Sequence, residues 1–92
     1  GQPVTRSPER VIRDVQVWPN PSDGHFRVRV ILNRQSDGLL RLYALTGVLL
    51  RELKCRGDKS YEFSFNESLP PGVYILHLIF GHEREAVKVA VE

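Results

Sequence analysis

Apolar residues concentrate most strongly in one stretch near the end of the chain, residues 72–80, in which only His77 is polar. Prolines precede this stretch, a glycine follows it, and β-branched and aromatic residues are frequent within it. A run of this length and composition is typical of a strand that is buried on both faces. Because side chains alternate along a strand, Tyr74 and Val73 are expected on opposite faces. The pattern therefore predicts that residues 72–80 form the central strand of a sheet.

Six further segments are predicted to be strands, and residues 25–32 alternate cleanly between apolar and polar positions, as a half-buried antiparallel strand does. The seven predicted strands are residues 11–18, 25–32, 39–45, 48–54, 60–66, 72–80 and 85–91. Their expected inward side chains include Phe26, Val28, Val30, Leu32, Tyr61, Phe63, Phe65, Val87, Val89 and Val91. Polar loops are expected at residues 33–38 and 56–59, and a tight turn at Thr46 and Gly47.

Short strands at regular spacing, without a helical period, predict an all-β fold. We expect an immunoglobulin-like antiparallel β-sandwich of about seven strands, with a closed barrel as the structural alternative. Residues 11–92 would form this domain. Residues 1–10 show no period and contain Pro3 and Pro8, so they are predicted to be an extended linker to an upstream domain. The chain start lacks the apolar block of a signal peptide, which suggests a domain excised from a longer precursor.

Residues 19–24 are predicted to reverse the chain between the first two strands. Pro19 and Pro21 fix φ, and Asn20 is held extended because a proline follows it. Asp23 and Gly24 supply residues that favour turns. The chain is therefore expected to reverse here.

Charge and cysteine content narrow the function classes. The net charge of +2 is too small to argue for a nucleic-acid partner. Ten of the 13 basic residues are arginine, and four of them occupy candidate strand positions: Arg27, Arg29, Arg41 and Arg51. A solvated outer face is the expected role of these arginines, with an anion or partner surface as the alternative. The single cysteine, Cys55, excludes an internal disulfide and is expected to be a core or surface thiol.

The search for catalytic and metal-binding motifs predicts a protein that is not an enzyme and binds no cofactor or metal. No serine lies in a G-x-S-x-G elbow, and there is no glycine-rich phosphate loop. His25, His77 and His82 lack the spacing of a metal site. Residues 56–58 spell Arg-Gly-Asp, a tripeptide that recurs by chance.

Three blocks and the terminal strand resemble the motifs of one family, the type A C-terminal sorting domains of the type IX secretion system of Bacteroidetes. They are residues 17–26 (VWPNPSDGHF), 42–50 (LYALTGVLL), 72–76 (GVYIL) and 87–91 (VKVAV). The resemblance extends from about Val15 to Glu92. Pro-Asn-Pro alone would be a weak signal, but several blocks in order and at the expected separations are more specific.

The resemblance implies a non-catalytic address label at the end of a larger cargo protein, with an immunoglobulin-like fold. In such a family the folded cargo reaches the periplasm, and components of the outer-membrane translocon recognise the last strands of the label. A surface sortase then commonly removes the label and joins the cargo to anionic lipopolysaccharide. The cargo would end at the cell surface or be secreted. By this analogy the cut would fall within or before residues 2–10, where an extended backbone can enter a protease cleft.

A receptor that reads a folded label can use side chains near the last strands or add a strand to an exposed edge. The residues predicted to form the recognition neighbourhood are Gly72, Val73, Tyr74, Lys88 and Val89. The residues predicted to shape the turns are Pro19, Asn20, Pro21, Gly24 and Gly47. A purely structural role is the alternative for many of them.

The sequence departs from the family pattern at three positions: Ala44 replaces a usual Asp, Val48 a common basic residue, and Glu92 a frequent terminal Lys. If Ala44, Leu45 and Val48 are exposed together, they would form a contact patch for a partner or for a second copy in a homodimer. The alternative is that they pack inward in a shifted register. Other functions left open are an uncleaved part of the secretion machinery, an adhesion or carbohydrate-binding module, and a plain stalk.

Overall fold

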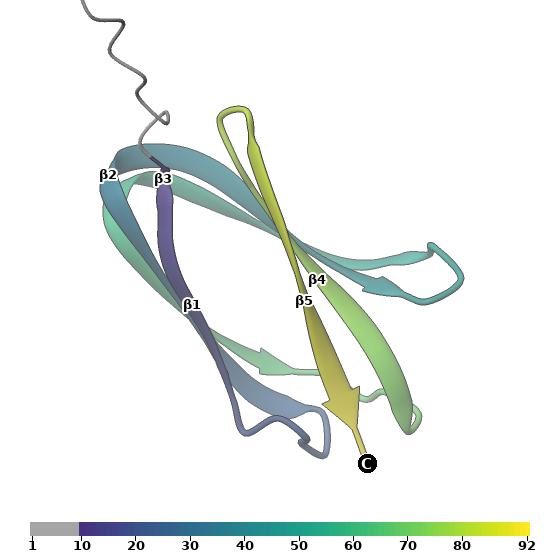
Figure 1. Ribbon diagram of the computed structural model, residues 1–92. Helices are drawn as coiled ribbons and strands as arrows, with labels where there is room; N and C mark the ends of the chain where they lie inside the picture. The colour runs from purple at the N-terminus through teal and green to yellow at the C-terminus, as the bar shows by residue number, and fades with distance from the viewer. Residues whose placement is uncertain (1–9) are drawn as a thin grey trace, which may run out of the picture.

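The strands of this chain are fewer and longer than the sequence suggests. The computed structural model describes residues 10–92, which form one antiparallel sheet (Figure 1). The five strands are β1 (Ile12–Trp18), β2 (His25–Ala44), β3 (Leu49–Asn66), β4 (Gly72–Phe80) and β5 (Glu83–Val91). The predicted all-β, antiparallel class is confirmed. The predicted linker, residues 1–10, lies outside the described residues except for Arg10.

The predicted loops at residues 33–38 and 56–59 are wrong, because both segments belong to strands. Within them β2 still pairs with β3, Ser36 with Asp58 and Gly38 with Cys55, with register shifts between these pairs. Side chains replace ladder hydrogen bonds here: Gly57 N–H donates to Asp37 Oδ1 at 2.7 Å, and Asp58 N–H donates to the Tyr61 hydroxyl at 2.8 Å. The Tyr61 hydroxyl in turn donates to Ser36 O at 2.9 Å. Residues that favour loops can therefore remain within an irregular part of a strand.

The sheet order is β1-β2-β4-β5, with β3 paired to β2. The first half of β2 pairs with β1, and its second half pairs with β4, so one long strand belongs to both halves of the sheet. The sheet curls so that its two halves enclose the core (Figure 1). The structure thus shows a curled five-stranded sheet and does not confirm a seven-stranded immunoglobulin-like sandwich.

The core is built by the inward side chains that alternation predicts. Phe26, Val28, Val30 and Leu32 of β2 are all buried, as are Val89 and Val91 of β5. Phe65 is buried, whereas Tyr61, Phe63 and Val87 are partly buried and pack against the core. The predicted orientation of these strands is therefore confirmed.

The prediction that residues 72–80 form a central strand buried on both faces is correct only in part. Strand β4 is an inner strand between β2 and β5, as expected. Its inward residues, Tyr74 among them, are buried, but Val73 is 40% exposed and His77 is also exposed. Burial on both faces is wrong because, within residues 10–92, no second layer covers the outer face of this half of the sheet.

Gly38, which the sequence analysis did not single out, allows β2 and β4 to approach each other closely. A Cβ on Gly38 would lie 2.4 Å from a ring carbon of Phe80 and 2.5 Å from Ile79 O. Only glycine lets β2 pass this close to β4 at the end of their ladder, where Gly38 is opposite Phe80.

Candidate recognition surface around the terminal strand

The predicted turn at residues 19–24 docks on the last strand. The Asn20 side-chain amide donates to Lys88 O at 2.9 Å, and its oxygen accepts the N–H of Ala90 at 2.8 Å. One side-chain amide thus pairs with the backbone of β5 in the way that a peptide group of a neighbouring strand would. Asn20 was predicted to shape a turn, and the structure adds that it binds the edge of β5.

Ser22 continues the same contact toward the end of the chain. Its N–H donates to Ala90 O at 3.0 Å, and its carbonyl accepts the N–H of Glu92 at 2.8 Å. Ser22 and Val91 form an isolated parallel bridge. Two residues of the turn, Asn20 and Ser22, therefore cover the outer edge of β5 from Lys88 to Glu92. Ser22 was missed by the sequence analysis because serine is common in turns of every kind.

Gly24 ends this turn in a conformation that requires glycine. Its φ is +105°, and a Cβ there would lie 2.2 Å from Glu67 O. Its carbonyl accepts the N–H of Glu67 at 2.9 Å, which ties the turn to the end of β3. Beside it, the backbone N–H of His25 donates to the Asp23 carboxylate, and this hydrogen bond is the main cause of the lowered pKa of Asp23. The predicted reversal of the chain is confirmed.

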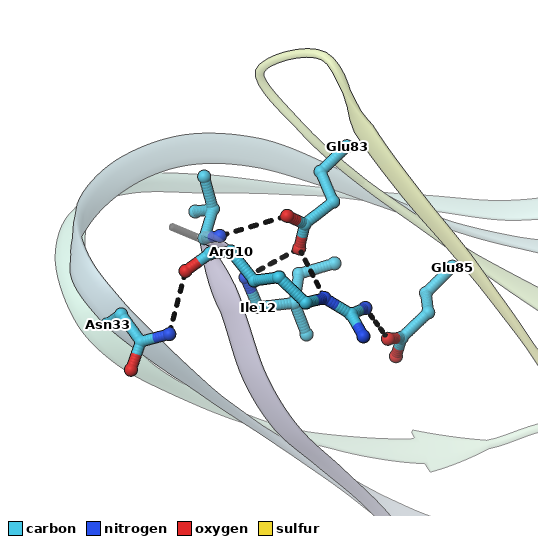
Figure 2. A network of polar contacts seen from close by, with 6 residues as sticks. Arg10, Ile12, Asn33, Glu83 and Glu85 are labelled. Atoms are coloured by element: carbon cyan, nitrogen blue, oxygen red, sulfur yellow. Dashed lines mark hydrogen bonds and ion pairs between the residues drawn. The ribbon is translucent and has the colours of Figure 1, made fainter. Parts of the chain in front are cut away.

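A second contact joins β5 to the start of β1 at the other end of β5 (Figure 2). The Glu83 carboxylate accepts the N–H of Val11 at 2.9 Å and the N–H of Ile12 at 2.7 Å. The Arg10 guanidinium forms ion pairs with both Glu83 and Glu85. The sequence analysis missed this cluster, since isolated glutamates near a turn carry no distinguishing pattern.

The pKa of Glu83 reflects these contacts. Desolvation of the carboxylate acts to raise its pKa, but the hydrogen bonds from Ile12 and Val11 and the positive charge of Arg10 act in the opposite direction and prevail. The pKa is lowered, so the ionised form of Glu83 holds β1 and β5 together.

The residues predicted to form the recognition neighbourhood divide between solvent and core. Gly72, Val73 and Lys88 are exposed, whereas Tyr74 and Val89, which are partners across the β4–β5 ladder, are buried. The Tyr74 hydroxyl donates to Pro70 O at 2.6 Å. A receptor that reads the folded domain can therefore touch Val73 and Lys88 directly. The role of all five residues in recognition stays a prediction.

The β2–β3 turn carries the most exposed apolar side chains of the described residues. Leu45 is 68% exposed and Val48 is 57% exposed, while Ala44 is half-buried against the core. The Gly47 N–H donates to Ala44 O at 2.9 Å, and Gly47 has a φ of +92°, so the predicted tight turn is confirmed. The inward-packed alternative is wrong for Leu45 and Val48. We call these two residues the tip patch.

The four strand arginines each lie beside a glutamate. Arg27 and Arg29 form ion pairs with Glu62, and the remaining pairs are Arg41 with Glu52 and Arg51 with Glu67. All four pairs are partly exposed to solvent. This arrangement fits the solvated outer face that we expected and leaves little unbalanced charge for an anion.

The described residues offer neither a reactive cysteine nor a metal-binding cluster. Cys55 is buried, and burial raises the pKa of its thiol to about 11, so it is not a reactive thiolate at neutral pH. Within residues 10–92, no three or more His, Cys, Asp or Glu side chains gather as a metal site would require. In the same range, no helix has the length and apolar character needed to span a membrane.

Comparison with known protein families gives a match over most of the chain. Residues 16–92 match a protein family described as "Secretion system C-terminal sorting domain". No curated protein matches the chain. The matched range contains the turn at residues 19–24, the tip patch and the whole of β4 and β5.

Proposed function

Because the chain belongs to the family of secretion system C-terminal sorting domains, we propose that it directs a folded cargo protein through the type IX secretion system and across the outer membrane. The family match confirms the resemblance seen in the sequence. It also makes the chain a sorting signal whose partners belong to the secretion machinery and whose destination is the cell surface or the medium. The family is one of sorting signals, not of catalysts.

One observation carries the proposal beyond family membership. The turn motif at residues 19–24 and the terminal strand, which lie at opposite ends of the matched range, form one hydrogen-bonded unit through Asn20 and Ser22. A receptor that contacts β5 therefore contacts a surface that exists only when the whole domain is folded. Such a surface suits a signal that is read in the periplasm after folding, with the outer-membrane translocon as the reader.

Removal of the label is a further part of the proposal. A surface sortase would cut the chain before or within residues 2–10 and attach the cargo to anionic lipopolysaccharide. Arg10 O accepts a hydrogen bond from the Asn33 amide at 2.7 Å, and Val11 and Ile12 donate to Glu83. A backbone whose carbonyl and N–H groups are already hydrogen-bonded to other parts of the domain is a poor protease substrate. We therefore place the cut on the N-terminal side of Arg10.

The test is a fusion of the full chain to a soluble reporter, expressed in a cell with a working type IX system. The reporter should reach the cell surface or the medium, and a fusion that lacks residues 85–92 should accumulate in the periplasm. Retention of the intact fusion in the periplasm, or normal delivery of the truncated one, would contradict the proposed function. A surface reporter that keeps residues 10–92 attached would indicate an uncleaved label.

A further inference from the structure

The backbone groups of β5 alternate between its two sides, and the contacts already described show which residues face outward. Lys88 O, both backbone groups of Ala90 and the N–H of Glu92 bond to Asn20 and Ser22, on the side away from β4. The ladder between β5 and β4 is regular from Glu83 to Val91. Because the direction of the backbone groups alternates along a strand, the N–H and C=O of Ala86 also point away from β4, as does the N–H of Lys88.

These outward groups in the middle of β5 have no partner among residues 10–92. The turn at residues 19–24 covers the edge from the Lys88 carbonyl onward, and Glu83 holds the other end to β1. No ladder joins β1 to β5, and each of these two strands has a ladder on one side only (Figure 1). Within residues 10–92, the outer edge of β5 therefore has unpaired backbone groups around Ala86, whereas both ends of the strand are held by other residues. We call this unpaired part the open edge. Unpaired N–H and C=O groups of an edge strand can form hydrogen bonds with another extended chain.

The side chains beside this open edge specify what kind of strand would fit. On the inner face, Val87 packs against the core yet is only half-buried, and Val15 and Val17 of β1 are half-buried in the same way. On the outer face, Arg84 and Lys88 are exposed, and neither side chain forms an ion pair within residues 10–92. The edge thus presents an apolar side and a cationic side.

A second copy of this chain is a poor occupant of the open edge. If two copies of β5 paired antiparallel about Ala86, Arg84 of each copy would lie directly opposite Lys88 of the other. Like charges directly opposite each other destabilise a strand pair. A partner strand with acidic residues at alternate positions would instead place a carboxylate opposite each cation.

We propose that the open segment of β5 around Ala86 is a strand-addition site for an extended, acidic segment of a partner protein. Carboxylates of that segment pair with Arg84 and Lys88, its intervening apolar side chains cover Val87, and its backbone bonds to Ala86 and Lys88. The inference rests on the proposed function in one respect only, namely that the partner is a component of the secretion machinery.

The experiment measures binding of two labelled eight-residue peptides to the full chain by fluorescence anisotropy. One peptide alternates valine with glutamate, and the other alternates valine with lysine. The glutamate peptide should bind at least about tenfold more tightly, and the double substitution Arg84→Glu with Lys88→Glu should reverse this preference. Hydrogen exchange of the Ala86 amide should be fast in the free chain and slowed by the glutamate peptide.

Ala86→Pro tests the backbone contact, because it removes only an outward N–H, and proline is tolerated at such edge positions. Ala86→Ser is the matched control, since it keeps the N–H and adds a small side chain. The proline variant should bind the glutamate peptide at least about tenfold more weakly than the serine variant, while thermal unfolding shows both to be folded. If Ala86→Pro does not fold, the charge-reversal variant decides the question.

Equal affinity for the two peptides, no binding of either at millimolar concentration, or slow exchange of the Ala86 amide in the free chain would overturn the inference. None of these readouts depends on export. A reporter fusion that stays in the periplasm would instead contradict the proposed function, and a peptide-binding result would be unaffected by it.

Discussion

Asn20 and Ala90 are 70 positions apart in the chain, yet the side-chain oxygen of Asn20 accepts the backbone N–H of Ala90 at 2.8 Å. The same amide donates to Lys88 O, so one side chain satisfies two backbone groups of an edge strand. An edge strand with fewer unpaired groups is less open to unintended pairing. The Pro-Asn-Pro motif is therefore part of the surface that β5 presents, as well as a turn.

Replacing Asn20 by alanine should destabilise the domain. Two hydrogen bonds are lost and two backbone groups become exposed to water, so we expect a cost of about 1–2 kcal/mol in unfolding free energy. For a domain of this size the corresponding fall in Tm is roughly 4–16 °C. Thermal unfolding followed by circular dichroism measures it. Asn66→Ala is the control, because the exposed Asn66 side chain makes no hydrogen bond within residues 10–92, and its Tm should hardly change. Equal Tm values for the two variants would contradict the assigned role of Asn20.

Glu83 should make the stability of the domain depend on acidity. Its pKa is lowered in the folded chain below the ordinary value for a glutamate, so folding is favoured while the carboxylate is ionised. This contribution is fully present above the pKa of the unfolded chain and is lost as the pH falls through the lower pKa of the folded chain. Glu83→Gln should therefore lower Tm at pH 7 and reduce its dependence on pH between about 3 and 5.

The matched control for Glu83 is Glu92→Gln, because the exposed Glu92 carboxylate has no hydrogen bond or ion pair within residues 10–92. Its Tm should follow that of the unmodified chain across the same range of pH. If Glu83→Gln instead keeps the full acid dependence of the unmodified chain, then Glu83 is not the group that holds β1 to β5.

The alternation of apolar and polar residues predicted the strands correctly where one face of the strand packs on the core, as at Phe26 and Val28. It failed at residues 33–38 and 56–59, because residues with turn propensity were read as loops. In the structure the Asp37 carboxylate and the Tyr61 hydroxyl satisfy the backbone of this region, and that arrangement depends on which strands become neighbours. Local propensity contains no such information.

Part of the candidate site could also be predicted from the sequence. The turn residues and the importance of the last strands followed from motifs within short windows. The docking of Asn20 on β5 and the Glu83 cluster did not follow, since each joins residues about 70 positions apart and depends on how the sheet curls. The predicted burial of β4 on both faces failed for the same reason: an apolar run does not reveal how many layers will cover it.

The tip patch should contribute to association and little to folding. Leu45 is 68% exposed and Val48 is 57% exposed, so replacing them together by serine and threonine should change the unfolding free energy by less than about 0.5 kcal/mol. If the predicted homodimer forms through this patch, sedimentation velocity should show dimers of the unmodified chain and monomers of the double variant. Leu40 is fully buried, and Leu40→Ser as a contrast should unfold the domain. Dimers that persist in the double variant would place the interface elsewhere.

Alanine substitutions at two glycines with positive φ would distinguish the cost of backbone strain from the cost of a steric clash. Gly24 and Gly47 have φ values of +105° and +92°, so alanine at either position should cost about 1–2 kcal/mol of strain. At Gly47 nothing lies within 4 Å of an added Cβ, and strain should be the whole effect. At Gly24 the Cβ would lie 2.2 Å from Glu67 O, so the backbone must shift, which adds roughly 1–3 kcal/mol. Urea unfolding of Gly24→Ala should therefore show the larger loss of stability, and equal losses would mean that the turn at residues 19–24 can move away from Glu67 at no cost.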